Sequence, residues 1–293
     1  MQIESLKVFC DLVETKSFTK AAKINAVTQS AVSQTISALE KHYNSLLIER
    51  SKKNLRLTRE GEVLYDYGNQ ILQTQDALQS KMQEVKDVIS GTISLATVYS
   101  LGLHVLPPCV KQFLNVRPTV NVHVEYRRAN QVYESVLGNV VDLGLVAYPV
   151  CNPKLEIVSL RDDKLALICH PQHPFAKRKS IKISALNGQK FINFEHDLPT
   201  RIALDKLFKK HRVTVQEVME MDNVETLKRA VEIESGIAIV PQETVEREVA
   251  TGTLALVQIE GGDFFRPLAL LYKKNKVLSP AIKQFIALLK ESL

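Results

Sequence analysis

The sequence of 293 residues lacks the features of a membrane or exported protein. No apolar run approaches the ~18–20 residues that a helix needs to cross a bilayer. The opening MQIESLKVFCDLVE carries acids where a signal peptide would have an apolar core, so we expect no export. The four cysteines are scattered and form no CxxC pair, which predicts reduced thiols in a cytoplasmic protein rather than disulfides or metal ligands.

Motifs of the common enzyme classes are also missing. The sequence has no GxSxG, P-loop or HExxH motif and no paired catalytic carboxylates. Four of its histidines, His104, His170, His173 and His196, show no metal-ligand spacing. We therefore predict a protein with no catalytic residues, no metal site and no tightly bound cofactor.

Positive charge is concentrated at the N-terminus. The whole chain has a formal net charge of +6 and a pI near 9.0. Residues 1–60 contain ten Lys and Arg against six Asp and Glu, so +4 of that charge lies in the first fifth of the chain. This asymmetry favours a polyanion-binding module there, although a merely soluble basic face would explain the charge alone equally well.

Three short helices are predicted in the first forty residues. Residues 4–14 have helical apolar spacing, and Ser17 and Thr28 are candidate N-caps for the next two helices. The third helix, TQSAVSQTISALE, buries one face and leaves small neutral polar side chains on the other. Its predicted buried residues are Val32, Ile36 and Leu39. Three helices joined by short turns are typical of a helix-turn-helix unit.

A basic hairpin and a long helix follow. LLIERSKKNLRLT turns on RSKKN and then alternates as a short strand would, which predicts a wing. Within residues 59–89, apolar residues recur every seven positions at Leu64, Ile71, Leu78 and Val85. This heptad pattern favours pairing with a second chain, and the alternative is a helix packed on its own domain.

The rest of the chain alternates between strand and helix patterns. That alternation predicts an α/β architecture with mostly parallel sheets, arranged as two lobes around a cleft. We expect a DNA-binding domain over residues 1–58, a linker helix over 59–89 and an effector-binding domain over 90–293. Lobe I would comprise residues 90–161 and 267–293, and lobe II residues 162–266.

Residues 17–62 resemble the N-terminal signature of LysR-type transcriptional regulators. The matching positions are Phe18, Ala21, Ala22, Thr28, Gln29, Ser30, Val32, Ser33, Leu39, Glu40, Leu47, Arg50, Leu57, Thr58 and Gly61. The resemblance extends over essentially the whole chain. It implies a winged helix-turn-helix, a linker helix and an effector domain similar to periplasmic binding proteins.

Three residues depart from the family pattern. Asn25 stands where an aliphatic residue is usual, so the second helix must accommodate an amide or turn Ile24 inward. Asn44 replaces a frequent glycine, and asparagine is the next best residue for a left-handed backbone. Ile48 replaces a frequent phenylalanine. These departures concern local packing rather than the expected DNA face.

The resemblance also implies the partners. They are double-stranded DNA with a dyad-symmetric promoter site, a small-molecule co-inducer or co-repressor, and further copies of the chain as a dimer of dimers. RNA polymerase is an additional candidate. Effector closure of the cleft would change the spacing of the DNA-binding heads or the bend of the DNA.

The third helix carries the residue types that read bases. Neutral side chains that both donate and accept hydrogen bonds match base edges in the major groove, and Gln29 can bond adenine bidentately. Candidate DNA-contacting residues on this helix are Thr28, Gln29, Ser30, Ser33, Gln34 and Ser37. Candidate phosphate-contacting residues in the wing are Arg50, Lys52, Lys53 and Arg56. The alternative for the polar face is a solvated surface.

Hydroxyl and amide side chains beside three helix N-termini predict the effector site. Such termini favour anions, and the family resemblance implies a small, often anionic, effector. The candidates are Thr97, Tyr99, Ser100, Tyr148, Thr200, Arg201 and Asn223, of which Ser100, Thr200 and Asn223 match effector positions in the family. The alternative is that these residues only cap helices.

Two consecutive arginines leave two interpretations open. Arg127 and Arg128 follow a predicted strand and could meet an acidic effector. They could instead pair with acids such as Glu195 or Asp197, which is the interpretation that we favour.

The sequence is compatible with three functions. A ligand-responsive transcription factor is favoured. An enzyme of periplasmic-binding-protein-like fold with an appended DNA-binding domain is the alternative. A DNA-bending protein without effector control would not need a two-lobed cleft.

Overall fold

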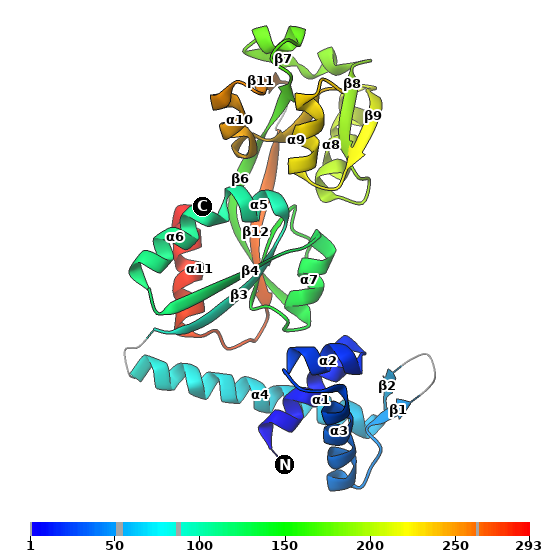
Figure 1. Cartoon of the computed structure of the whole chain (residues 1–293), viewed down its shortest axis with the longest axis vertical. Helices are drawn as coiled ribbons and strands as arrows, with labels where there is room; N and C mark the ends of the chain where they lie inside the picture. Colours follow the sequence, from blue (N-terminus) through cyan, green and yellow to red (C-terminus); the bar gives the residue numbers. More distant parts are fainter. Residues whose placement is uncertain (1, 51–54, 86–88, 262–263) are drawn as a thin grey trace. The chain divides into compact units, whose positions relative to one another are not determined.

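The structure is a computed structural model that describes residues 2–50, 55–85, 89–261 and 264–293 (Figure 1). The chain divides into two compact units, Met1–Ser90 with Asn275–Lys283, and Gly91–Lys274 with Gln284–Leu293. Within the described residues, no helix is both long and apolar enough to cross a lipid bilayer.

The first unit begins with three helices, α1 (Ile3–Thr15), α2 (Phe18–Ile24) and α3 (Gln29–Tyr43). The predicted N-caps are confirmed, because the Ser17 hydroxyl accepts from Lys20 N and the Thr28 hydroxyl accepts from Ala31 N. The predicted buried face of α3 is confirmed as well, since Val32, Ile36 and Leu39 lie in the core of this unit. Capping therefore fixes where these helices begin, and apolar spacing fixes how they pack.

Asn25 is accommodated as a hydrogen-bonded amide. Its Nδ2 donates to Asp11 Oδ2 at 2.7 Å and to Ala21 O at 3.0 Å, and its Oδ1 accepts from Lys7 Nζ at 3.1 Å. Ile24 stays exposed, so the helix does not turn inward to bury it. The amide is satisfied locally and costs the domain no buried polar group.

Asn44 ends α3 in a left-handed conformation with φ of 47° and ψ of 40°, which confirms the expectation for that position. The wing follows as an antiparallel pair, β1 (Ile48–Arg50) and β2 (Leu55–Leu57). Lys52 and Lys53 lie outside the described residues.

The long helix α4 (Arg59–Val85) starts in close contact with the wing. A Cβ on Gly61 would lie 2.1 Å from Leu47 O, so no larger residue fits there without moving the backbone. The helix packs on the core formed by α1, α2, α3 and the wing, called the head below, through residues such as Leu64 and Leu72. Further along, Leu78 is 62% exposed and Met82 is 51% exposed within the single chain. One part of the apolar stripe thus packs on the domain of the helix itself, and the other part is left uncovered in the single chain.

The second unit contains two lobes. Lobe I is built from β3 (Gly91–Thr97), α5 (Tyr99–His104), α6 (Leu106–Val116), β4 (Val120–Tyr126), α7 (Ala129–Leu137), β5 (Leu143–Ala147) and α11 (Pro280–Ser292). Its strands β4, β3 and β5 are parallel neighbours. Helices α6 and α11 cover one face, where the Phe113 and Phe285 rings meet edge-on at 5.0 Å, and α7 packs on the other (Figure 1).

Lobe II surrounds a large apolar core. Its elements are η1 (Pro174–Lys177), β7 (Ser180–Lys182), η2 (Ile183–Leu186), β8 (Lys190–Phe194), α8 (Pro199–His211), β9 (Gln216–Met221), α9 (Val224–Glu232), β10 (Ala238–Pro241), η3 (Gln242–Val245), α10 (Glu246–Thr251) and β11 (Ala255–Glu260). Strands β8 and β9 are parallel. The Phe191 and Phe208 rings join β8 to α8 within this core, with centroids 5.4 Å apart.

Two long strands connect the lobes, β6 (Leu155–Cys169) and β12 (Phe265–Lys273). They pair antiparallel from Leu155 to Lys164, and beyond that point β6 pairs with β10 and β11. The α/β architecture is therefore confirmed. The sheets are mixed rather than mostly parallel, because both crossing strands run against their neighbours in lobe I and lobe II.

Candidate functional site

The outward face of α3 presents small neutral polar side chains. Gln29, Ser30, Gln34 and Ser37 are exposed, and Ser33 is half-buried beside them. Thr28 differs, since its hydroxyl caps the helix and also lies 2.9 Å from Ser30 Oγ. The helix therefore offers amide and hydroxyl groups at its surface while its apolar face is held in the core.

The strands of the wing hold two of the predicted phosphate-contacting residues. Arg56 lies on β2 with its side chain exposed, and Arg50 ends β1 opposite Leu55 in the strand register.

A cavity of about 90 Å³ lies between the two lobes of the second unit. Lobe I contributes residues from α5 and from the start of α7, and lobe II contributes the starts of α8 and α9. Its lining residues are Val98, Tyr99, Ser100, Arg127, Arg128, Ala129, Ala147, Phe194, Leu198, Pro199, Thr200, Asp222, Asn223, Val224, Pro241 and Arg266. Four of the predicted effector residues, Tyr99, Ser100, Thr200 and Asn223, therefore come together from distant parts of the chain.

Ser100 is held by a buried ion pair that the sequence analysis did not identify. Arg266 Nη1 donates to Ser100 Oγ at 3.0 Å, and Arg266 Nε donates to Asp163 Oδ2 at 2.9 Å. Arg266 is 3% exposed and Asp163 is 2% exposed. Because the serine oxygen accepts from the guanidinium, its own hydroxyl proton is available to donate to a ligand.

Thr200 lies in the first turn of α8, directly after Pro199. The first backbone N–H groups of a helix have no partner within the helix, and Leu198, Pro199 and Thr200 at the start of α8 line the cavity. Asn223 is used differently. Its Oδ1 caps α9 by accepting from Glu225 N at 2.9 Å and Thr226 N at 3.1 Å, which is the capping role foreseen as its alternative.

Two predicted effector residues lie away from this cavity. The Thr97 hydroxyl is buried and donates to Leu145 O at 3.2 Å. Arg201 points toward carboxylates of α8 and β9, with ion-pair distances of 2.9 Å to Asp205, 2.9 Å to Glu217 and 3.0 Å to Glu220. Both side chains therefore serve structural contacts in this conformation.

Tyr148 lines a second cavity of about 470 Å³ beside the first. The two cavities share Arg128, Ala129, Ala147, Leu198 and Pro199. Burial raises the pKa of the Tyr148 hydroxyl to about 12, so it remains protonated at neutral pH. Tyr99 stays at the mouth of the first cavity and stacks on Tyr126, with ring centroids 5.3 Å apart.

The two consecutive arginines both form ion pairs. Arg127, the residue after β4, pairs with Glu125 of that strand. Arg128 reaches across to lobe II, where it contacts Glu195 and donates from Nη1 to Asp197 Oδ2 at 3.0 Å. The favoured ion-pair interpretation is confirmed for Arg128 with both predicted acids, and both arginines also line the cavity.

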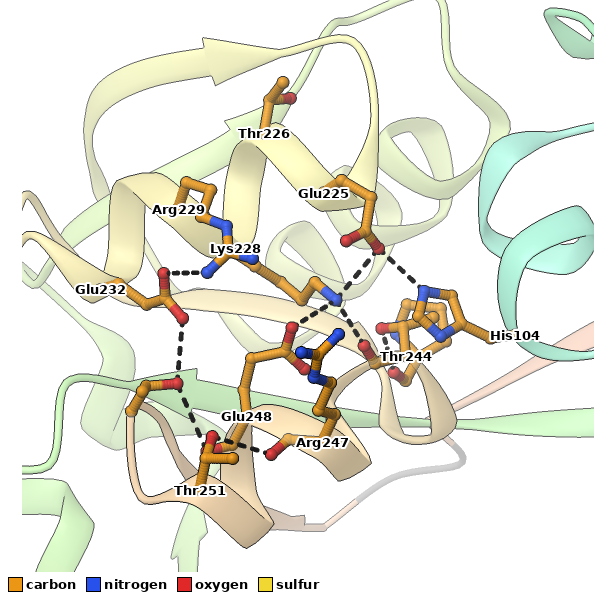
Figure 2. A network of polar contacts seen from close by, with 12 residues as sticks. His104, Glu225, Thr226, Lys228, Arg229, Glu232, Thr244, Arg247, Glu248 and Thr251 are labelled. Atoms are coloured by element: carbon orange, nitrogen blue, oxygen red, sulfur yellow. Dashed lines mark hydrogen bonds and ion pairs between the residues drawn. The ribbon is translucent and has the colours of Figure 1, made fainter.

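A second polar contact joins the lobes. Figure 2 shows His104 of α5 directed at Glu225 of α9, with 2.8 Å between Nε2 and Oε1. The same carboxylate lies 3.0 Å from Lys228 Nζ, which is 1% exposed and also contacts Glu248 at 2.9 Å and Thr244 O at 2.7 Å. The buried ammonium is therefore fully partnered, as a buried charge must be.

The four cysteines are thiols, and one of them, Cys151, lines the second cavity. Cys10, Cys109, Cys151 and Cys169 form no disulfide, and burial raises the pKa of the Cys169 thiol to about 11. Among the residues that the structure describes, no group of three or more His, Cys, Asp and Glu side chains could hold a metal ion.

Comparison with known proteins matches two family models to the chain, one near each end. Residues 3–62 match the model for the bacterial regulatory helix-turn-helix protein, lysR family, and residues 86–293 match the LysR substrate binding domain. The transcriptional activator CmpR of Synechocystis is 28% identical over 97% of this chain and 93% of its own length.

Solved structures show the same fold. A full-length OxyR variant from Pseudomonas aeruginosa superposes with a TM-score of 0.77 at 20% identity, covering 100% of this chain and 94% of its own. The regulatory domain of Synechocystis CcmR, solved in complex with 2-PG, has a TM-score of 0.63 at 27% identity over 69% of this chain and 97% of its own. The relatives are named as regulators of transcription, not as enzymes. The chain belongs to the LysR family of helix-turn-helix transcriptional regulators and carries the effector-binding domain of that family.

Proposed function

We propose that the protein binds a small organic anion in the cavity between its lobes and reads DNA bases with the neutral face of α3. The observation that carries the effector assignment is the cavity lining. It brings together three guanidinium groups, those of Arg127, Arg128 and Arg266, with a single lining carboxylate, Asp222. The available Ser100 hydroxyl and the first turn of α8 add hydrogen-bond donors suited to a carboxylate or phosphate group.

For DNA binding, the proposal rests on a difference in residue type: α3 has neutral polar side chains, and the wing has cationic residues. Gln29, Ser30, Ser33, Gln34 and Ser37 present groups that match base edges in the major groove. The arginines and lysines of the wing would contact phosphates, and such contacts supply affinity without sequence preference. Thr28 would contribute by setting the start of the helix.

The assembly and cellular context follow from the same proposal. The exposed apolar segment of α4 supports pairing with a second chain, and a pair of heads suits a dyad-symmetric promoter site. We extend this to a dimer of dimers in the cytoplasm, with RNA polymerase as a further partner. The effector would act as co-inducer or co-repressor and no tightly bound cofactor is required. Lobe motion on effector binding would change the spacing of the heads or the bend of the DNA.

The test uses the full-length protein. Thermal unfolding is measured with a panel of small carboxylates and phosphates that includes 2-PG, the ligand named in the CcmR structure. Stabilisation by an anion without its turnover, together with a footprint or DNA bend that changes with that anion, would support the proposal. Turnover of the stabilising compound would favour the enzyme alternative, and a footprint and bend unchanged by it would contradict effector control.

A further inference from the structure

The arginines that line the cavity are not free to receive an anion. Arg266 is paired with Asp163, Arg127 with Glu125, and Arg128 with the two acids Glu195 and Asp197. With these partners counted, the three guanidinium groups face four carboxylates, and Asp222 adds another. An anionic ligand therefore needs one arginine to change partners.

The three pairs differ in how readily they can separate. Arg266 and Asp163 are both buried, and breaking a buried pair leaves an uncompensated charge in the interior. Arg127 and its acid are two residues apart on one chain segment, so motion of the lobes does not separate them. The side chains of Glu195 and Asp197 are 37% and 66% exposed and come from the opposite lobe. Their contacts with Arg128 are thus the ones that water and lobe motion can release.

Arg128 lines both cavities, the one of about 90 Å³ and the adjoining one of about 470 Å³, which Asp197 lines as well. Pockets that enclose small-molecule ligands usually measure roughly 300–1,000 Å³, so the second cavity has room for a small organic anion beside Arg128 and one of its acidic partners. Parting the lobes at the start of α8 stretches the contacts of Arg128 with Glu195 and Asp197.

We propose that Arg128 exchanges partners, so that the acidic group of the effector replaces Glu195 and Asp197 on its guanidinium. The two carboxylates then act as internal competitors that hold the lobes together and weaken effector binding. The planar guanidinium fork favours a carboxylate or phosphate group that can accept two hydrogen bonds. This inference rests on the proposed function, and it names the residues that set the affinity of that site.

The first experiment removes the competitors. Glu195→Gln and Asp197→Asn are combined in the full-length protein, and affinity for 2-PG and for inorganic phosphate is measured by calorimetry. Exposed ion pairs are weak, so removing two predicts an affinity gain of about three- to thirtyfold. The matched control combines Asp205→Asn with Glu246→Gln, which removes two acids of the same lobe. Neither control residue lines a cavity or contacts Arg128, so the control should bind as the unchanged protein does.

The second experiment separates exchange from a general change in charge. Arg128→Gln is introduced alone and together with Glu195→Gln and Asp197→Asn. Exchange requires Arg128, so its loss should weaken binding and abolish the gain from the two acid substitutions. A gain that persists without Arg128 would reveal long-range electrostatics and overturn exchange. Equal affinity in the unchanged protein and the Glu195/Asp197 variant would overturn the partner exchange of Arg128 and leave the anionic effector standing. If neither the unchanged protein nor any variant binds 2-PG or phosphate, both the partner exchange and the anionic effector are overturned.

Discussion

Arg266 Nη1 donates a hydrogen bond to Ser100 Oγ at 3.0 Å, which ties a strand that crosses between the lobes to the first turn of α5. The same guanidinium holds Asp163 on the other crossing strand. One buried cation therefore links both crossing strands to the helix that lines the cavity. This arrangement leads to two predictions about stability and ligand binding.

Replacing only one member of the buried pair should be costly. Arg266→Met leaves the Asp163 carboxylate buried without a partner, and such a loss typically costs about 3–5 kcal/mol. We expect the free energy of unfolding in urea to fall by that order. A variant that also carries Asp163→Leu should recover most of the loss, because no charge is left unpaired. Equal destabilisation in the single and double variants would show that the charge is not what matters.

Ser100→Ala should weaken effector binding more than it weakens the fold. It removes one donor to the ligand and one acceptor from Arg266, whose Nε still donates to Asp163. A lost hydrogen bond to a charged group is worth about 1.5–3 kcal/mol. Calorimetry with the stabilising anion should therefore show affinity reduced by at least tenfold. Unchanged affinity would remove Ser100 from the site.

The contact between His104, Glu225 and Lys228 predicts sensitivity to acid. Burial acts to raise the pKa of Glu225, but hydrogen bonds from His104 and Lys228 outweigh it and hold the pKa below its ordinary value of 4.5. Because the pKa of this carboxyl is lower in the folded protein than in the unfolded chain, its ionised form stabilises the fold at pH values above the ordinary pKa. That stabilisation is lost as the pH falls through the pKa of the folded state.

The measurement is thermal unfolding between about pH 3 and pH 7. The unchanged protein should lose stability below about pH 4.5 more steeply than Glu225→Gln, in which that carboxyl no longer titrates. Asp205→Asn, an exposed acid on α8, serves as the control. Parallel curves for the unchanged protein and Glu225→Gln would contradict the prediction.

Gln29→Ala should relax base preference. A lost bidentate contact to a base costs about 1–3 kcal/mol at the matched site and little on shuffled DNA. Arg56→Gln should instead weaken binding to both DNAs and flatten the salt dependence. Titrations on matched and shuffled sites at several salt concentrations separate the two effects. Equal losses on both DNAs for Gln29→Ala would refute base readout by that residue.

The apolar stripe of α4 has a part that packs on the head and a part that is exposed. We therefore expect a charged substitution to have different effects in the two parts. Leu78→Asp lies on the exposed segment and should reduce the mass measured by sedimentation while leaving the fold of the head intact. Leu64→Asp lies against the core of the head and should lower the melting temperature instead. An unchanged mass for Leu78→Asp would count against pairing through this segment.

Much of the fold could be predicted because its signals are local. Ser17 and Thr28 cap helices by contacts within three residues, and Asn44 adopts the left-handed conformation expected of a residue that replaces glycine. The sheet order could not be predicted in the same way, since β6 and β12 pair across more than a hundred residues and their antiparallel contact has no short-range signature.

The residues of the effector site also differ in whether a local sequence signal identifies them. Ser100, Thr200 and Asn223 are recognisable because each follows a strand and opens a helix. Arg266 and Asp163 were missed because they lie on separate strands about a hundred residues apart, and Asp163 stands within the charged run RDDK of residues 161–164. The available signal was Arg266, a lone charge in the apolar run FFRPLALL, which needs a partner where it is buried.

The two crossing strands also determine how the lobes can fold. Lobe II is one uninterrupted stretch that runs from β6 to the start of β12, whereas lobe I is made of the two stretches on either side of it. The pairing of β6 with β12 joins both lobes through the same two strands, so we expect the two lobes to unfold together. Hydrogen exchange should accordingly be slowest along the crossing strands and should slow further in both lobes together when a ligand binds.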